Sequence, residues 1–128
     1  MLALLDTHAF LWWLADSKRL SRAAYGAIAE EENDISVSAA SAWEIVTKYR
    51  LGKLPEAEVA ALDVSGAIAR QGFEPLAITV ADAEHAGHLP GPHRDPFDRM
   101  LIAQALRRDF AIVSIDAAFD AYGVRRIW

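Results

Sequence analysis

The chain has 128 residues, of which 53% are hydrophobic, enough for one compact domain with a sizeable core. It contains no cysteine, which excludes disulfides, thiolate metal sites and cysteine nucleophiles. The formal net charge of −5 argues against a protein that binds nucleic acid through bulk positive charge.

The N-terminal half alternates strand and helix patterns. Leu2–Leu5 is a continuous apolar run, typical of a strand buried on both faces of a parallel sheet. It has no basic flank and is too short to cross a bilayer, so we expect no signal peptide, no membrane contact and a cytoplasmic location. Phe10–Leu14 places five apolar residues in a row, and part of this surface must meet another layer, a second subunit or a partner. The elements predicted here are a strand at 2–5, helices at 7–15 and 21–32, a strand at 35–37 and a helix at 38–50.

The C-terminal half continues the alternation. Pro75 confines the strand around it to an edge of the sheet, and Arg125 and Arg126 mark the last strand as an edge strand too. The elements predicted here are a helix at 55–69 with Pro55 at its first position, a strand at 73–78, a helix at 80–86, a loop at 87–94, a helix from 96 to 107 or 108, a strand at 110–114, a helical turn at 117–121 and a strand at 124–128.

Strands that alternate with helices indicate βαβ units, and hence a three-layer α/β/α sandwich with a central, mostly parallel sheet over residues 1–128. In such sheets ligands bind beyond the carboxyl ends of the strands. Asp6 and Asp116 follow two buried strands, and Glu44 follows a third by one to two helical turns. Asp98 lies in the first turn of a helix that Asp95–Pro96 can begin. We therefore expect Asp6, Glu44, Asp98 and Asp116 to converge at one edge of the sheet.

Four converging carboxylates describe a site for a hard cation such as Mg²⁺ or Mn²⁺. Without a cation the carboxylates would repel one another, and at least one would be driven toward protonation. One or two such ions could activate a water molecule and hold a phosphodiester for in-line attack. Metal-dependent phosphoester hydrolysis is therefore the leading class of reaction, with the substrate left open.

Each acid also has an ordinary structural explanation. Asp6 and Asp116 could be plain helix N-caps. Glu44 has a capping-box spacing from Ser41 and a surface ion-pair spacing from Lys48. Two strands that both end in aspartate, with two further acids placed to converge, favour a site over these explanations.

The histidines and arginines near the acids are less informative. His85, His88 and His93 could bind zinc, but their segment is broken by glycine and proline, so solvated loop histidines are favoured. Arg94 and Arg99 could meet phosphate, although a solvated or carboxylate-paired arginine is the default expectation.

Four segments together resemble the PIN-domain nucleases, and among these the VapC-type toxins of bacterial toxin–antitoxin pairs. The segments, in this order along the whole chain, are Asp6–Trp12, Ser41–Ile45, Asp95–Ala105 and Ser114–Phe119. The resemblance implies an Mg²⁺- or Mn²⁺-dependent endoribonuclease that leaves 5′-phosphate and 3′-hydroxyl ends on RNA. It implies that Asp6, Glu44, Asp98 and Asp116 form the catalytic and metal-binding quartet, with Asp95 as a cap or supporting group. It also implies a homodimer inhibited by a cognate antitoxin protein.

Three other readings compete with this one. A receiver domain would need a pair of acids after the first strand, where Asp6 stands alone, and a lysine where Asp116 stands. A phosphatase of the haloacid dehalogenase type would need a second aspartate where His8 stands. The non-enzyme alternative is a catalytically silent PIN-fold module that binds RNA or a partner, which is disfavoured because all four acids are present.

Overall fold

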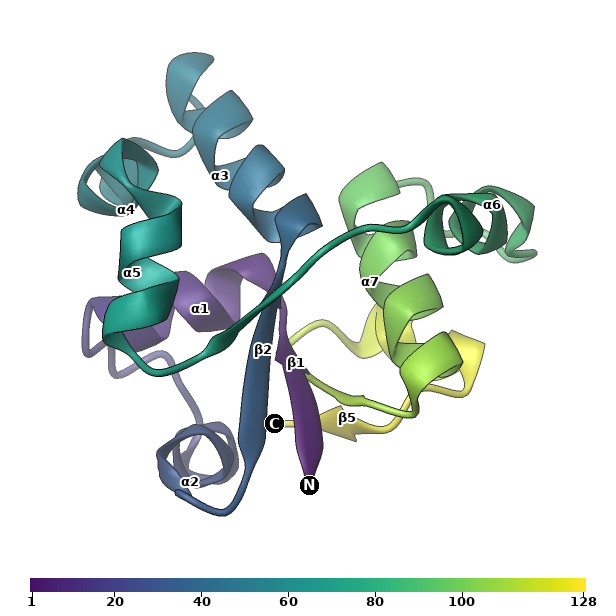
Figure 1. The fold of residues 1–128 in the computed structure, drawn as a ribbon, viewed down its shortest axis with the longest axis horizontal. Helices are drawn as coiled ribbons and strands as arrows, with labels where there is room; N and C mark the ends of the chain where they lie inside the picture. Colours follow the sequence, from purple (N-terminus) through teal and green to yellow (C-terminus); the bar gives the residue numbers. More distant parts are fainter.

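The computed structural model describes residues 1–128 and has a five-stranded sheet with helices on both faces (Figure 1). The strand order is β3-β2-β1-β4-β5, and all four neighbouring pairs are parallel. This is the predicted α/β/α sandwich. The strands are β1 (Leu2–Leu5), β2 (Asp34–Ser38), β3 (Glu74–Leu76), β4 (Ala111–Val113) and β5 (Arg126–Ile127). The helices are α1 (Thr7–Leu14), α2 (Arg22–Ala29), α3 (Ala39–Arg50), η1 (Pro55–Ala57), α4 (Glu58–Leu62), α5 (Val64–Arg70), α6 (Val80–His88), α7 (Pro96–Arg108) and η2 (Ala117–Tyr122).

The central strand β1 is buried on both faces, as its apolar run predicts. Ala3 and Leu5 point into one core cluster, and Leu4 points into the other, because successive side chains of a strand alternate between faces. The first cluster contains 18 buried residues and the second only 8, so the face covered by α1, α2 and α5 supplies most of the core. The second face is covered by α7 and η2 (Figure 1).

The apolar run Phe10–Leu14 is covered mainly by other parts of the same chain. Phe10 is fully buried, and the ring of Trp13 packs against Tyr25 and Phe73. The indole N–H of Trp13 also donates a hydrogen bond of 2.9 Å to Gln71. A second layer of the fold therefore covers part of this run, while Trp12, Trp13 and Leu14 remain partly exposed.

The helix predicted over residues 55–69 is wrong as a single element, because the structure has η1, α4 and α5 there. Asp63 interrupts it, because this residue leaves the helical conformation and its carboxylate caps α5 by accepting the N–H of Gly66 at 2.9 Å. The predicted loop at 87–94 also begins too early, since α6 continues through His88.

Both edge strands are confirmed, with Pro75 in β3 and Arg126 in β5. No helix has both the length and the apolar character needed to cross a bilayer.

Helices α6 and α7 are joined by one buried carboxylate. Asp82 is fully buried and forms a capping box with Thr79 at the start of α6. It also accepts hydrogen bonds from Gln104, Arg107 and Arg108 of α7, including two of 2.8 Å from Arg108. These contacts hold the pKa of the Asp82 carboxyl well below its ordinary value, despite the burial that opposes them.

Candidate functional site

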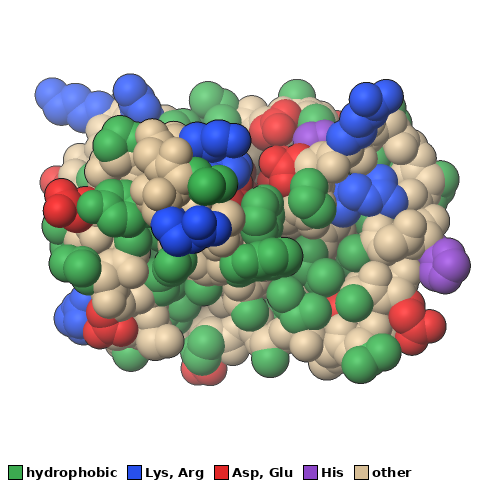
Figure 2. Space-filling view, turned by 90° about the horizontal axis from the view of Figure 1, so that it is seen from above, with side chains coloured by type: hydrophobic (Ala, Val, Ile, Leu, Met, Phe, Trp, Pro, Cys, Tyr) green, Lys and Arg blue, Asp and Glu red, His purple; other side chains and the backbone are tan.

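A cleft of about 540 Å³ opens beyond the carboxyl ends of the strands. Figure 2, which looks onto this end of the molecule, shows acidic side chains and a histidine gathered between lysine and arginine side chains. All four acids singled out in the sequence line the cleft. The lining residues are Asp6, Thr7, His8, Trp12, Glu44, Lys48, Asp95, Asp98, Ile115 and Asp116.

Asp6 enters the cleft directly from the end of β1. It is also the N-cap of α1, where one carboxylate oxygen accepts the N–H of Ala9 at 2.8 Å. Burial raises the pKa of the Asp6 carboxyl, although hydrogen bonds from Ser114 and Ala9 oppose the shift. The capping explanation is thus correct, but capping does not remove Asp6 from the cleft.

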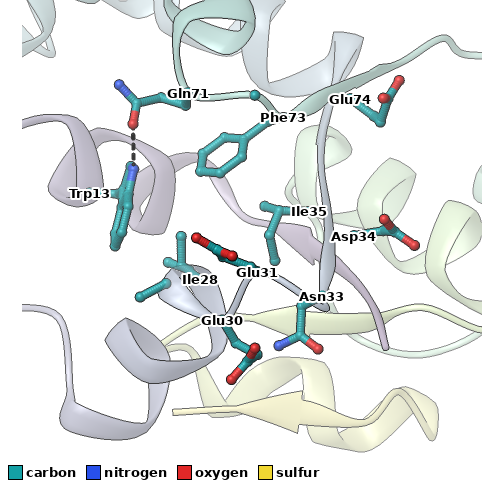
Figure 3. Close-up of a pocket in the computed structure, with 12 residues that line it drawn as sticks. Trp13, Ile28, Glu30, Glu31, Asn33, Asp34, Ile35, Gln71, Phe73 and Glu74 are labelled. Atoms are coloured by element: carbon teal, nitrogen blue, oxygen red, sulfur yellow. Dashed lines mark hydrogen bonds between the residues drawn. The ribbon is translucent and has the colours of Figure 1, made fainter.

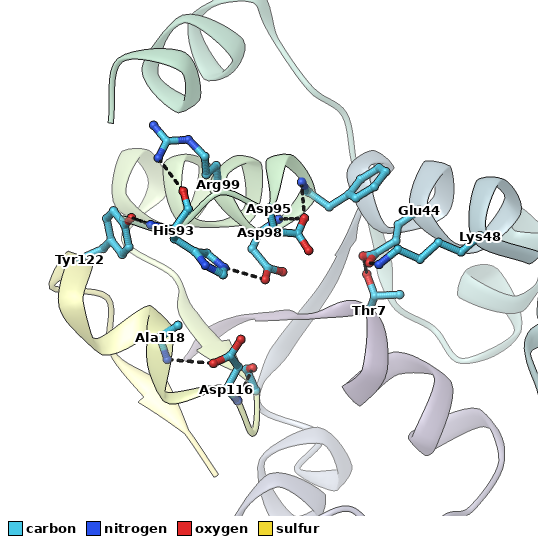
Figure 4. Close-up of polar contacts among 12 residues, drawn as sticks. Thr7, Glu44, Lys48, His93, Asp95, Asp98, Arg99, Asp116, Ala118 and Tyr122 are labelled. Atoms are coloured by element: carbon cyan, nitrogen blue, oxygen red, sulfur yellow. Dashed lines mark hydrogen bonds and ion pairs between the residues drawn. The ribbon is translucent and has the colours of Figure 1, made fainter. Parts of the chain in front are cut away.

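Glu44 lies on α3 and is only 4% exposed. The hydroxyl of Thr7 donates to Oε1, and the ammonium group of Lys48 pairs with Oε2 (Figure 4). Burial alone would lower the pKa of Lys48, but its hydrogen bond and charge interaction with Glu44 raise it. Of the two structural explanations for Glu44, the ion pair with Lys48 forms, whereas the capping box does not, because Ser38 caps α3 and Ser41 lies 3.1 Å from the Thr7 hydroxyl.

Asp98 lies in the first turn of α7, which Asp95 caps by accepting the N–H groups of Phe97 and Asp98. Burial raises the pKa of the Asp98 carboxyl to about 6, and the negative charges of Asp95 and Glu44 add to the shift. A hydrogen bond of 2.8 Å to Nε2 of His93 opposes the shift. Burial is thus the main reason that the pKa of Asp98 is raised, and the neighbouring carboxylates strengthen the effect.

His93 was expected to be a solvated loop residue, and this expectation is wrong. Its side chain is 19% exposed and points toward Asp98 and Asp116 (Figure 4). One nitrogen of His93 and one carboxylate oxygen from each of Asp98 and Asp116 all lie within 4.8 Å of one another. Asp116 comes from the loop after β4 and caps η2 through the N–H of Ala118.

The four predicted acids therefore occupy the cleft in two subsets. Asp98 and Asp116 belong to the compact group with His93, whereas Asp6 and Glu44 line the same cleft outside that group. The predicted zinc alternative does not form, because His85 and His88 lie on α6 and do not join His93 in a metal-binding group. Sequence reasoning missed His93 because its distance from Asp98 depends on the fold of the 89–95 segment.

Arg99 does not pair with a carboxylate, which was one form of the default expectation for it. Its guanidinium donates to the backbone carbonyls of Ala86, Leu89 and His93. Arg99 therefore orders the segment that carries His93 and does not neutralise the neighbouring carboxylates. Arg94 is exposed.

The residues of the cleft fit a divalent cation. Five carboxylates line it, and Lys48 is the only lysine or arginine among the lining residues. Oxygen-rich donor sets of this kind suit Mg²⁺ and Mn²⁺. A cation would favour the ionised forms of Asp6 and Asp98, whose pKa values are raised by burial and, to a smaller extent, by neighbouring carboxylates.

A second hollow, of about 440 Å³, lies at the opposite end of the sheet, where β2 and β3 begin (Figure 3). Glu30, Glu31, Asp34 and Glu74 border it, together with apolar side chains such as Phe73. These acids do not form a group within metal-binding distance, unlike those of the first cleft. The hollow therefore lacks the charge arrangement that singles out the carboxyl-end cleft.

Comparisons with known proteins find relatives of this chain. The family model of the PIN domain matches residues 3–124. The chain is 45% identical over 58 residues to a Mycobacterium tuberculosis protein named ribonuclease VapC16, a match that covers 45% of this chain and 41% of the relative. The match thus spans less than half of either protein.

Two solved structures share the fold. VapBC2 from Rickettsia felis, bound to a DNA fragment from its promoter, gives a TM-score of 0.70 at 16% identity and covers 98% of this chain and 97% of that one. VapC20 from Mycobacterium tuberculosis, described as a toxin that cleaves the sarcin–ricin loop, gives a TM-score of 0.65 at 16% identity and covers 95% of each chain.

Proposed function

Since this chain belongs to the PIN-domain family, we propose that it is a metal-dependent endoribonuclease and the toxin of a toxin–antitoxin pair. The observation that carries the proposal is the convergence of Asp6, Glu44, Asp98 and Asp116 on one cleft. The matched relative is named a ribonuclease, and one structural neighbour is described as a toxin that cleaves the sarcin–ricin loop, which supports the same class of substrate.

The proposed catalytic and metal-binding residues are the four acids, with Mg²⁺ or Mn²⁺ as the cation. When bound, the cation would activate a water molecule and balance the charge that develops on the phosphodiester. Asp98, Asp116 and Asp6 would hold it, directly or through water. Glu44 would orient the attacking water or the cation, because Thr7 and Lys48 fix both of its carboxylate oxygens.

The cleft's own side chains suit an RNA backbone in a second respect. Lys48 remains 32% exposed while it pairs with Glu44, so its charge can also meet a phosphate group. His8 and Trp12 lie on the rim, with their rings 5.6 Å apart, and an aromatic rim offers a stacking surface for an unpaired base. We propose single-stranded or looped RNA as the substrate form.

The test is cleavage of a mixed RNA pool by antitoxin-free, folded protein in Mg²⁺, Mn²⁺ or EDTA. We expect cleavage that requires the metal and yields 5′-phosphate and 3′-hydroxyl ends. Asp98→Asn should abolish it, whereas Asp120→Asn, which changes an exposed acid paired with Arg126 outside the cleft, should not. A folded protein that binds RNA but never cleaves it would instead support the silent binding module.

We further propose a cognate antitoxin, a homodimer and a cytoplasmic location. Apolar side chains on α3 and α4 remain open to solvent, with Trp43 65% exposed and Val59 and Leu62 each 80% exposed. Apolar surface of this kind is typical of an interface with another protein. Light scattering of the purified chain alone measures the mass of the proposed homodimer. The same measurement after a candidate antitoxin is added measures the mass of the proposed complex.

A further inference from the structure

We propose that His93 supplies a nitrogen ligand to the cation in this cleft, beside Asp98 and Asp116, and that it biases the site toward a transition-metal ion such as Mn²⁺ over Mg²⁺. The inference deepens the proposed function and rests on it only in requiring that a cation binds in the acidic cleft.

The distances among the three side chains fit one coordination sphere. Two ligands at right angles on an octahedral ion, each about 2.1 Å from it, are about 3 Å apart, and opposite ligands are about 4.2 Å apart. Nε2 of His93 lies 2.8 Å from Oδ2 of Asp98, close to the separation of adjacent ligands. The group as a whole spans at most 4.8 Å, so only small side-chain movements would bring all three onto one ion.

The imidazole is held in place before any ion binds. The backbone N–H of His93 donates to the hydroxyl of Tyr122 at 3.0 Å, and its carbonyl accepts from Arg99 at 3.1 Å. The ring packs edge-on against fully buried Phe119, with centroids 6.3 Å apart. Fixed ligand side chains lose little conformational entropy when a metal binds, which favours a ligand role.

A nitrogen ligand changes which ion the site prefers. Carboxylates and water suit Mg²⁺, whereas imidazole favours first-row transition metals. Among these ions, the affinity of a given site is lowest for Mn²⁺ and rises along the series to Cu²⁺. With His93 as a ligand the site would combine oxygen and nitrogen donors. The competing explanation is that His93 only orients Asp98 through the hydrogen bond between their side chains.

Pulsed electron paramagnetic resonance of the Mn²⁺-loaded protein separates the two roles, because a directly bound imidazole gives a ¹⁴N modulation of the spin echo. We expect this modulation in the wild type and its loss in His93→Gln. Two control variants should keep the modulation. His8→Gln removes a second histidine, on the rim of the cleft, and His88→Gln removes an exposed histidine of α6. No ¹⁴N modulation in the wild type, or its survival in His93→Gln, would overturn the proposal.

Calorimetry provides a second readout that does not depend on RNA cleavage. His93→Gln should raise the Kd for Mn²⁺ by about tenfold or more, and the Kd for Mg²⁺ by less than about threefold. Equal weakening for both ions would assign His93 to the orientation of Asp98 and reject the ligand role. If the variant does not fold, wild-type protein labelled with ¹⁵N-histidine tests nitrogen ligation, since the ¹⁴N modulation must then disappear.

The two proposals can fail separately. A protein that cleaves RNA but shows no ¹⁴N modulation retains the nuclease function and loses the ligand role of His93. A protein that shows the modulation but cleaves no RNA retains the ligand role and loses the nuclease function.

Discussion

Asp98→Asn is expected to stabilise the metal-free protein even though it should abolish RNA cleavage. The carboxylate of Asp98 is 19% exposed and lies near the negative charges of Asp95 and Glu44. An asparagine has nearly the same shape, carries no charge, and its amide oxygen can still accept the hydrogen bond from His93. The substitution therefore removes the cost of burying a charge, and the smaller repulsion from Asp95 and Glu44, with little change in packing.

The size of the effect follows from the pKa of the Asp98 carboxyl. The folded protein raises that pKa from 3.8 to about 6, which corresponds to about 3 kcal/mol in favour of the neutral form. Because the folded-state pKa is raised, the free energy of unfolding falls as pH rises from about 4 to about 6, and it stays low above pH 6. Asparagine loses the favourable interaction of an acid with the start of α7, about 0.3–1 kcal/mol. The net gain for the variant near pH 7.5 should be about 2 kcal/mol.

Thermal unfolding in EDTA measures this gain. At pH 7.5 the Tm of Asp98→Asn should exceed that of the wild type by about 6–10 °C, and at pH 4 the two should be equal. Saturating Mn²⁺ should raise the Tm of the wild type more than that of the variant, because an ion stabilises whichever protein binds it. A variant that is no more stable than the wild type in EDTA at pH 7.5 would refute the electrostatic reasoning.

Three further substitutions test the supports of the site and the fold. Thr7→Val removes the hydroxyl that donates to Glu44 and should lower kcat/KM for RNA about 10- to 100-fold, with circular dichroism unchanged. Asp82→Ala leaves two arginines of α7 without their buried partner and should lower the free energy of unfolding by about 3 kcal/mol in urea titrations. Gly91→Ala should lower it by about 1–3 kcal/mol, because φ is +106° and a Cβ would lie 2.7 Å from the Tyr122 hydroxyl; an unchanged urea midpoint would contradict this.

The parts of the fold that could be predicted are those encoded by local patterns. The run Leu2–Leu5 predicts its own burial, and Pro75 predicts an edge strand, because each signal depends only on neighbouring residues. The break at Asp63 is harder to predict, since the flanking residues favour helix and the competing conformation is stabilised by one hydrogen bond to Gly66. A capping spacing of three residues between Asp63 and Gly66 is the only local signal for it.

The site could be predicted in its residue types but not in its pairings. Strand ends and helix starts place the four acids at one edge, since the carboxyl ends of parallel strands share that edge. The contacts that support the acids come from residues distant in sequence. Thr7 reaches Glu44 across 37 positions, and Tyr122 reaches the backbone of His93 across 29. Only the folded chain shows these contacts.

The contacts of the Arg99 guanidinium help to explain why the cleft remains negative. A guanidinium paired with Asp98 in a bidentate manner would have neutralised that carboxylate and lowered its pKa. Asp82 shows the effect elsewhere in this protein, since Arg108 pairs with it and holds its pKa low. Arg99 instead donates to three backbone carbonyls, and the pKa of Asp98 is raised. The chain thus uses its arginines to join α6 to α7 and to order the segment before α7, and it leaves the cleft carboxylates available to a cation.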